Sequence, residues 1–165
     1  MTQDNKGTSR PSFAKGVLGV GIAQQLRPLA QGLSRLDAAR KSSFGPGGRA
    51  ILDCIHEAER PIGAAAVVRM LFLDRQPVQR TLERLRANGL VERLENPDHL
   101  RVPLFKLTKK GTSELEKVHE AEAEVLGAML APFTNSELEA CARLLLHLRI
   151  ELSVREQGPS VKHKR

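Results

Sequence analysis

The segment from Asp74 to Arg93 has apolar positions at helical spacing along one side only. Three apolar side chains recur at i, i+4 and i+7 and so share one face of a helix: Val78, Leu82 and Leu85. Polar side chains fill the opposite face: Arg75, Gln76, Gln79, Arg80 and Glu83. Asp74 stands at the N-cap position, where its carboxylate can accept a backbone N–H, and Gly89 follows the last turn, where a left-handed residue is favoured. The pattern predicts a helix with one face buried and one face presented outward.

The segments on either side of this helix complete a larger motif. Residues 64–71 form a short helical run, and three or four residues join it to the next helix, which is typical of a helix-turn-helix. Residues 90–94 alternate like a half-buried strand, 96–98 form a turn cluster, and 101–107 are predicted to return as a second strand. Pro103 inside that strand is tolerable on a sheet edge. Helix, turn, helix and hairpin together predict a winged helix.

The remaining apolar positions predict helices. A helix at 22–40 should bend at Pro28, and one at 47–58 should bury Ala50, Ile51, Cys54 and Ile55. Thr108 should cap a helix at 109–130 with one apolar stripe: Leu115, Val118, Ala121, Val125, Leu126 and Met129. Thr134 and Glu137 have capping-box spacing and introduce the last helix. We expect residues 1–12 to be a disordered arm and 156–165 a basic flexible tail, with a single domain at 13–155 between them.

The last helix carries more apolar surface than one partner helix would cover, because Cys141, Leu144 and Ile150 widen its apolar face. Such a surface favours a homodimer. The expected contacts across the interface are Leu138, Leu145, Leu148 and Leu152. The predicted fold class is therefore mainly α with a small β-hairpin wing, in which a winged helix-turn-helix at 47–110 is flanked by N- and C-terminal dimerisation helices at 22–40 and 109–154.

Composition and charge favour an acidic partner for the middle of the chain. The 165 residues carry a formal charge of +7, with five Phe and neither Trp nor Tyr. Residues 60–110 hold eleven Lys and Arg against five Asp and Glu, whereas residues 111–155 hold four against eight. A basic middle and an acidic C-terminal region are expected when only the middle faces phosphate. The lack of Trp and Tyr disfavours stacking on single-stranded nucleic acid.

Three segments in register resemble the MarR family of transcriptional regulators. They are Val78–Leu85, Gly89–Arg93 and Leu107–Gly111, which correspond to that family's recognition helix, first wing strand and strand-to-helix junction. The resemblance extends more weakly over residues 26–152. It departs at the wing tip, where the family's Asp-Arg-Arg run falls on His99-Leu100-Arg101 and only Arg101 is kept. The resemblance implies a homodimeric DNA-binding regulator, most often a repressor, with small aromatic acids as effectors.

The outward face of the predicted recognition helix and the wing supply the expected DNA contacts. Gln76, Gln79 and Arg80 are expected at base edges in the major groove, and Arg101 in the minor groove, preferably where it is A·T-rich. The full set of predicted DNA-binding residues is Arg75, Gln76, Gln79, Arg80, Arg101, Arg69 and Lys106. An effector is expected between the dimerisation helices and the winged-helix lobe. Its candidate contacts are Arg27, Arg49, His56 and Phe72, with Phe44 as a second aromatic side chain.

No catalytic or metal-binding constellation emerges, so the sequence predicts neither an enzyme nor a cofactor. The five histidines fall on different predicted elements, and Cys54 and Cys141 have no paired spacing. Cys54 is expected in the core, an intersubunit disulfide through Cys141 is disfavoured, and cysteine usage fits a reducing cytoplasm. The short apolar run at 15–23 is interrupted by three glycines and is not interpreted as a signal peptide, and no stretch approaches transmembrane length.

Two functions remain open on the sequence. The leading hypothesis is a sequence-specific double-stranded DNA-binding regulator, acting as a homodimer on a pseudo-palindromic operator and released by a small aromatic or acidic effector. The alternative is an architectural or protein-interaction winged-helix module without operator specificity. Salt dependence and sequence preference of duplex binding separate the two.

Overall fold

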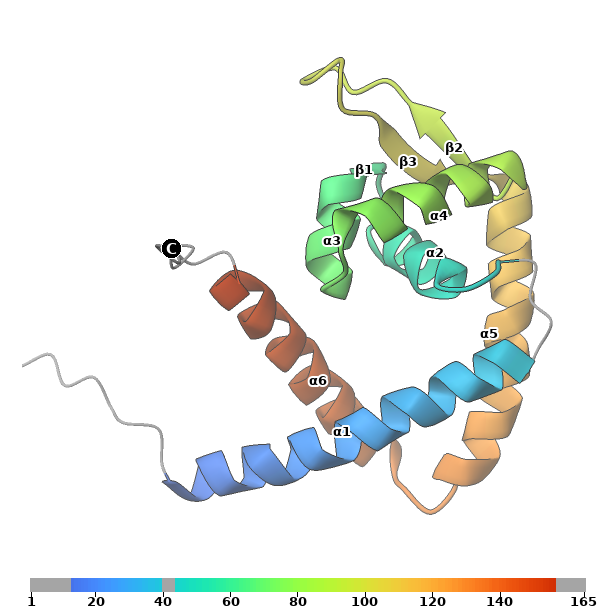
Figure 1. Cartoon of the computed structure of the whole chain (residues 1–165). Coiled ribbons are helices and arrows are strands. Elements are labelled where there is room, and N and C mark those ends of the chain that lie inside the picture. The colour runs from blue at the N-terminus through green and yellow to red at the C-terminus, as the bar shows by residue number, and fades with distance from the viewer. Residues whose placement is uncertain (1–12, 40–43, 157–165) are drawn as a thin grey trace, which may run out of the picture. The chain divides into compact units, whose positions relative to one another are not determined.

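The computed structural model describes residues 13–39 and 44–156, and these ranges hold six helices and three strands (Figure 1). The chain divides into two compact units after residue 43. Helix α1, Phe13–Ala39, belongs to the first unit, and all other elements belong to the second. The predicted arm at 1–12 and residues 157–165 of the predicted tail lie outside the described residues. None of the described helices is both long and apolar enough to cross a membrane.

Helix α1 begins earlier than predicted and includes the glycine-containing run at 15–23. Pro28 lies inside the helix and does not interrupt it. The bend expected at this residue stays a prediction, because an interior proline removes one N–H donor and favours a kink. Five large apolar side chains of α1 are exposed: Val17, Leu18, Val20, Leu29 and Leu33.

The core of the second unit lies between α2, Gly48–Glu57, α3, Ala64–Leu71, and α4, Arg75–Ala87. Three residues join α3 to α4, which confirms the predicted helix-turn-helix. The largest fully buried side chains include Ile51, Leu52, Leu82 and Leu85. One predicted core position is wrong: Ala50 is exposed and Leu52 is buried in its place. Burying Leu52 rather than Ala50 removes more apolar surface from water, because leucine has the larger side chain.

The wing is formed by β2, Val91–Leu94, and β3, Leu104–Leu107, which pair antiparallel with Val91 opposite Leu107. The returning strand therefore begins at Leu104 rather than at Arg101. Pro103 comes immediately before the strand, where its missing N–H costs no ladder hydrogen bond. A third strand, β1 (Ile62–Gly63), pairs with the other side of β3 and gives the order β1-β3-β2. The sequence does not predict β1, because two residues are too few to show the alternation that indicates a strand.

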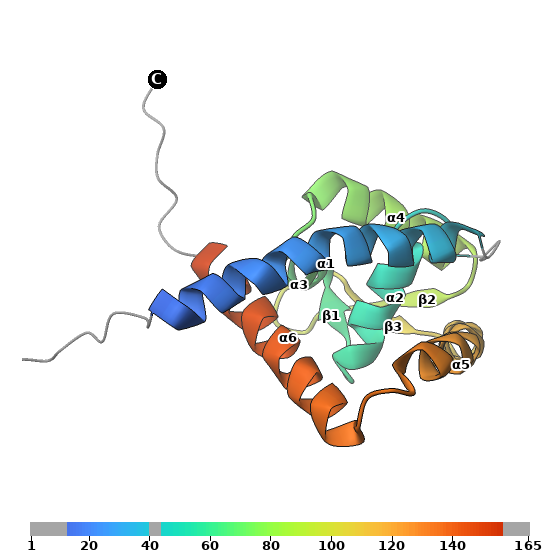
Figure 2. The same ribbon diagram turned by 90° about the horizontal axis from the view of Figure 1, so that it is seen from below.

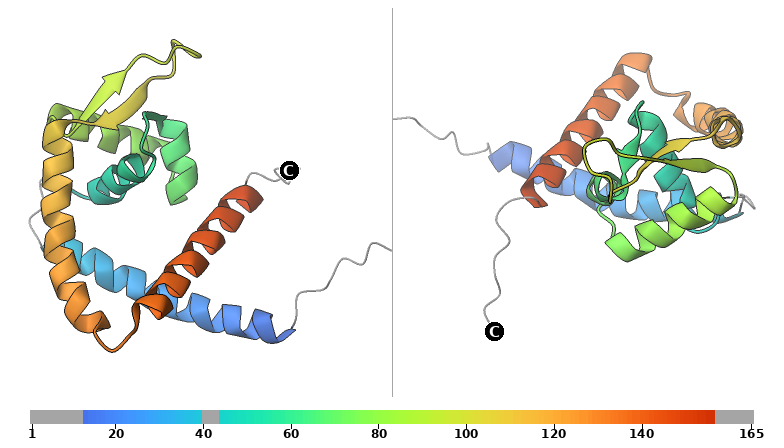
Figure 3. Two further views of the ribbon diagram at one scale, coloured as in Figure 1. Left: turned by 180° about the vertical axis from the view of Figure 1, so that it is seen from behind. Right: turned by 90° about the horizontal axis from the view of Figure 1, so that it is seen from above.

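Helix α5, Lys109–Leu130, leaves the end of the wing, and α6, Asn135–Glu156, follows a short connection (Figures 2 and 3). Thr108 caps α5, because its hydroxyl accepts a hydrogen bond from the Gly111 N–H at 2.9 Å. The capping box before α6 is also confirmed. The Thr134 N–H donates to the Glu137 carboxylate at 2.8 Å, and the Glu137 N–H donates to the Thr134 hydroxyl at 3.3 Å. The first of these bonds lowers the pKa of Glu137.

Little of the apolar stripe predicted on α5 is covered within the chain. Leu115 is fully buried, and Val118 and Leu126 are partly buried. The other three positions of the stripe, Ala121, Val125 and Met129, are exposed. Helix α5 therefore packs on the lobe mainly through its first half.

Candidate nucleic-acid interface

Helix α4 presents a polar face to solvent over a face that is fixed in the core. Val78, Leu82 and Leu85 are buried, and Thr81 joins them. The opposite face is exposed and consists of Arg75, Gln76, Gln79, Arg80 and Glu83, as predicted. Because its inner side is fixed by packing, the helix holds these long side chains at defined positions. Side chains spaced by three or four residues on one face of a helix are arranged to reach successive base edges in a groove.

The start of α4 differs from the prediction in one respect. Asp74 is the N-cap residue, with the extended backbone of that position, but its carboxylate makes no capping hydrogen bond. An N-cap side chain accepts from the N–H of the second or third helical residue. The third residue of α4 is Pro77, which has no N–H, so one of the two backbone donors that could bond to the Asp74 carboxylate is absent. The Asp74 carbonyl still accepts from the Val78 N–H at 3.3 Å and begins the helix.

The end of α4 is closed by a left-handed residue and fastened to α5. Gly89 has a φ of 69°, and the Leu90 N–H donates to the Leu85 carbonyl at 2.9 Å. The Thr108 hydroxyl donates to the Gly89 carbonyl at 2.7 Å, and Lys110 Nζ donates to the Asn88 carbonyl at 2.9 Å. Carbonyls that a helix end leaves open are thus satisfied from the next helix.

Gly111 makes the same junction sterically close. A Cβ placed on Gly111 would lie 1.9 Å from the Leu90 carbonyl oxygen, which no side chain tolerates. Only glycine allows α5 to start against the backbone that leaves α4. The segment Leu107–Gly111, which resembles the family's strand-to-helix junction, therefore joins the end of α4 to the start of α5. We refer to these contacts as the α4–α5 junction.

Two of the four arginines on α4 are engaged within the protein. Arg84 donates through Nη2 to the Pro46 carbonyl at 2.7 Å and so holds the loop before α2. Gly45 lies beneath its guanidinium with a φ of 65°. Arg86 pairs with Glu83 at 2.8 Å. Within the described ranges, Arg75 and Arg80 form neither an ion pair nor a hydrogen bond, so their charges are available to a ligand.

The other predicted DNA contacts lie outside α4. Arg69 is exposed on α3, and Arg101 is exposed in the turn at the wing tip. Lys106 lies opposite Glu92 in the sheet, and its Nζ is 3.1 Å from that carboxylate. The Lys106 charge is therefore already partnered, although an exposed pair of this kind is weak.

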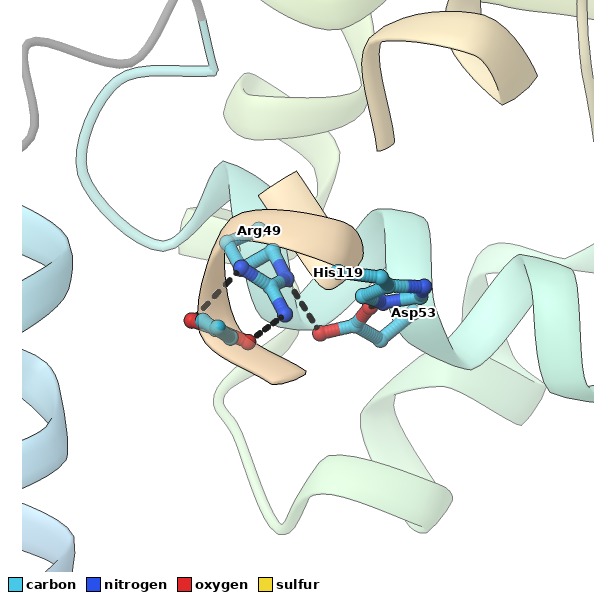
Figure 4. A network of polar contacts seen from close by, with 4 residues as sticks. Arg49, Asp53 and His119 are labelled. Carbon is cyan, nitrogen blue, oxygen red and sulfur yellow. Dashed lines mark hydrogen bonds and ion pairs between the residues drawn. The ribbon is translucent and has the colours of Figure 1, made fainter. Parts of the chain in front are cut away.

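The candidate effector contact Arg49 is held in a polar network between α2 and α5 (Figure 4). Its guanidinium pairs with Asp53 at 2.8 Å and with Glu122 at 2.6 Å, and His119 Nε2 lies 2.8 Å from the other Asp53 oxygen. Burial lowers the pKa of Arg49, but the bonds and charges of Glu122 and Asp53 outweigh that effect and raise it. Arg49 and Asp53 lie four residues apart on α2, but 73 residues separate Arg49 from Glu122 and 66 separate Asp53 from His119, so the sequence does not predict the contacts between the two helices.

The remaining effector candidates lie on different elements. His56 is exposed at the end of α2, with its ring 6.1 Å from that of His119, and Phe72 is exposed with a left-handed backbone. Arg27 is exposed on α1. Phe44 is buried in the core, so it is not available for stacking on a ligand.

The cysteines and histidines do not form a reactive centre in the described part of the chain. No group of three or more His, Cys, Asp or Glu is placed to hold a metal ion there. Cys54 is buried, as predicted, and burial raises the pKa of its thiol to about 11. Cys141 is exposed, and both thiols are free.

Comparison with solved structures identifies the fold. A MarR family transcription regulator superposes with a TM-score of 0.61 at 23% identity, covering 88% of this chain and 97% of that one. Apo MarR from E. coli superposes with a TM-score of 0.59 at 25% identity, covering 76% and 95%. The PcaV regulator from Streptomyces coelicolor, solved with its natural ligand, gives 0.59 at 21% identity, covering 90% and 96%. Neither models of protein families nor the sequences of curated proteins gave a match.

Proposed function

We propose that this chain, which has the MarR-like winged-helix fold, is a sequence-specific regulator that binds double-stranded DNA. The observation that carries the proposal is the outward face of α4. Gln76, Gln79 and Arg80 project from the second helix of a helix-turn-helix, and the side chains beneath them are fixed in the core. The solved structures that the chain resembles are transcription regulators, not enzymes.

In this proposal α4 enters the major groove. Gln reads adenine and Arg reads guanine through bidentate hydrogen bonds, and both residue types stand on the exposed face. Arg75 and Arg80 keep their charges unpaired in the described residues, and Arg69 adds a third exposed cation on the preceding helix. The net positive charge of residues 60–110 supports attraction to phosphate, whereas the acidic segment after residue 110 would be repelled by phosphate.

The proposal includes a homodimer on a pseudo-palindromic operator. Helix α6 contacts α3 but leaves several large apolar side chains exposed, among them Leu144, Leu145, Ile150 and Leu152. Contiguous exposed apolar surface of this kind is typical of a protein–protein interface. A two-fold dimer would present two copies of α4 to half-sites about one helical turn apart.

Repression relieved by an effector completes the proposed mechanism. PcaV was solved with a natural ligand, which supports a small-molecule effector for a chain of this fold. Within the second unit, a small aromatic or acidic effector would find exposed side chains at His56 and Phe72, but Arg49 would first have to leave Glu122 and Asp53. An effector shifts the protein between DNA-binding states only if it binds one state better.

The test begins with selection of duplexes from a random pool, followed by fluorescence anisotropy on the selected sequence and on a scrambled one. We expect affinity for the selected duplex to exceed that for the scrambled one by about a thousandfold or more at physiological salt. Affinity for both should fall as salt rises. Equal affinity for the two duplexes would exclude an operator-specific regulator and favour the architectural or protein-interaction module.

The effector is tested separately from DNA recognition. An aromatic carboxylate, such as salicylate, is titrated into the protein with and without the selected duplex, and heat of binding is measured by calorimetry. Tighter binding to the free protein than to the complex is expected, because the two ligands would favour different states. Equal binding in both titrations, or none by any compound tested, would remove the effector from the proposal and leave the DNA-binding function intact.

A further inference from the structure

The tip of the wing is built from two consecutive turns. The His99 N–H donates to the Asn96 carbonyl at 3.2 Å, and the Asn96 side chain accepts from the Asp98 N–H at 3.0 Å. The Val102 N–H then donates to the His99 carbonyl at 2.8 Å. Leu100 and Arg101 are therefore the two central residues of the second turn, whose side chains project away from the chain that carries them. The hairpin extends beyond the helices of the lobe (Figures 1 and 3).

An apolar side chain occupies this projecting position. Leu100 is 82% exposed, which is more than any other large apolar side chain in the described ranges, and Val102 in the same turn is 45% exposed. Single exposed leucines on a flat surface are ordinary. A leucine at the tip of a hairpin is different, because it can enter a narrow space that the rest of the surface cannot reach.

The net charge of the hairpin is zero and therefore does not attract it to phosphate. Residues 91–107 hold three basic and three acidic side chains, and Lys106 is paired with Glu92 at 3.1 Å. Asp98 lies just before the tip. A neutral hairpin gains little from the phosphate backbone as a whole. The net charge therefore gives no reason for DNA to contact the hairpin along its length, whereas the tip presents one cation beside one apolar side chain.

We infer that Leu100 acts as a wedge that enters the minor groove beside Arg101 and partly opens a base step, so that the wing selects deformable DNA. Apolar side chains inserted between base pairs unstack and bend the duplex, and leucine is among the residues that do so. Arg101 supplies the charge that the negative potential of the groove attracts. Pyrimidine–purine steps such as TA open most easily. This inference rests on the proposed function and assigns the wing a role in sequence selection that needs no hydrogen bond to a base.

The experiment compares two duplexes that share the selected core sequence and differ only in the flank that the wing reaches. One flank contains a TA step, and the other contains a stiff A-tract. Affinity is measured by fluorescence anisotropy, and bending is measured by energy transfer between dyes at the duplex ends. The proteins are the full chain, Leu100→Ala, Leu100→Phe, and Val102→Ala. Val102→Ala removes an apolar side chain that is 45% exposed in the same turn but does not occupy one of its two central positions, and it serves as the matched control.

The wild-type protein should bind the TA-flanked duplex about tenfold more tightly than the A-tract duplex and should bend it more. Leu100→Ala should reduce that difference to about twofold or less by weakening only the TA-flanked complex, and should straighten the DNA. Leu100→Phe, which keeps a wedge, should retain both the preference and the bend. Val102→Ala should behave as the wild-type protein does.

The outcomes separate this inference from the proposed function. If the wild-type protein shows no sequence preference at all, both the wedge and the proposed function are overturned. Specific binding with identical affinities and bends for wild type and Leu100→Ala would overturn the wedge and leave the proposed function in place. An equal loss on both duplexes, without a change in bend, would make Leu100 a plain groove contact and refute the wedge. Unchanged DNA binding with altered regulation in cells would assign the tip to a protein partner and also refute it.

Discussion

At the scale of the residue, the partners of each arginine on α4 determine the role it can take. Arg84 donates a hydrogen bond to the loop before α2, and Arg86 forms an ion pair with Glu83. Arg75 and Arg80 have no ion pair or hydrogen bond in the described residues. All four belong to one helix and have the same charge. Substituting them one at a time therefore separates DNA recognition from folding on a single element.

Arg80→Ala should weaken binding to the selected duplex by about 1 to 3 kcal/mol and leave the free energy of unfolding unchanged, because one bidentate base contact is lost. Arg84→Ala should instead lower the free energy of unfolding by about 1.5 to 3 kcal/mol through its lost hydrogen bonds, with specificity retained in the folded fraction. Arg143→Ala, on α6, is the control for loss of charge alone. Anisotropy and urea denaturation measure the two effects, and wild-type affinity in Arg80→Ala would contradict the assignment.

Cys54 should be unreactive in the native protein. Burial is the first cause that raises its thiol pKa to about 11, and the negative charge of Glu57 adds to it. In Cys141→Ser, which leaves Cys54 as the sole thiol, a disulfide reagent at pH 8 should modify the protein only as fast as it unfolds. The reverse variant, Cys54→Ser, leaves the exposed Cys141 and should react at once. Rapid labelling of native Cys141→Ser would make Cys54 a candidate redox sensor.

The same thiol gives stability a defined pH dependence. Its pKa is higher in the folded state than the ordinary value of 9.0, so the unfolded state loses the proton first. The contribution of Cys54 is therefore complete below pH 9 and is lost as the pH rises through about 11. Urea midpoints of wild type and Cys54→Ala, measured from pH 8 to pH 10.5, should converge as the pH rises. Parallel curves would show that the thiol does not titrate on unfolding.

At the scale of the element, the α4–α5 junction should tolerate no side chain at Gly111. Gly111→Ala places a Cβ against the Leu90 carbonyl and should lower the free energy of unfolding by about 1 to 3 kcal/mol. Gly127→Ala is a matched control on the same helix, where a Cβ meets nothing within 4 Å. It should stabilise the protein by about 0.5 to 1 kcal/mol, because alanine favours a helix. Thermal unfolding of the two variants measures the difference, and equal melting temperatures would contradict the close approach.

Elements with strong periodicity were predictable from the sequence, and so were their caps, except for the capping bond expected from the Asp74 carboxylate. The buried face of α4, the left-handed Gly89 and the reciprocal bonds of Thr134 and Glu137 all follow from local spacing. Contacts between distant segments were not predictable. Glu122 reaches Arg49 across 73 residues, and Arg84 reaches Pro46 across 38. The pattern of charges along the sequence gives no sign of such partners, so the pairing of Arg49 with Glu122 could not be predicted, and the role of Arg49 in effector binding stays a prediction.

At the scale of the whole molecule, the exposed apolar side chains on α6 are where the proposed dimer is expected to form its interface. Leu145 is 37% exposed and Leu152 is 56% exposed, and the proposed dimer would cover both. Deletion of the residues after Thr134 should leave monomers or cause aggregation, but such a deletion also removes a structural helix. Point substitutions that keep α6 provide a cleaner test.

Leu145→Glu together with Leu152→Glu should convert the dimer to monomers, because two buried charges per subunit would face an apolar surface without partners. Light scattering after size-exclusion chromatography measures the mass, and far-ultraviolet circular dichroism verifies that the helices remain. Lys117→Glu, which changes an exposed side chain on α5, should leave the mass unchanged. A double variant that keeps the dimer mass would move the interface away from α6.

The α4–α5 junction makes α5 a lever. Thr108, Lys110 and Gly111 attach the beginning of α5 to the end of α4, so the two helices must tilt together. The 22 residues of α5 extend about 33 Å at 1.5 Å per residue. A tilt of about 5° at one end of such a rod displaces the other end by about 3 Å, close to the 3.4 Å that separates successive base pairs. In the proposed complex with DNA, a rotation of about 5° about the end of α5 remote from the junction would therefore displace the end of α4 by about the spacing of one base pair.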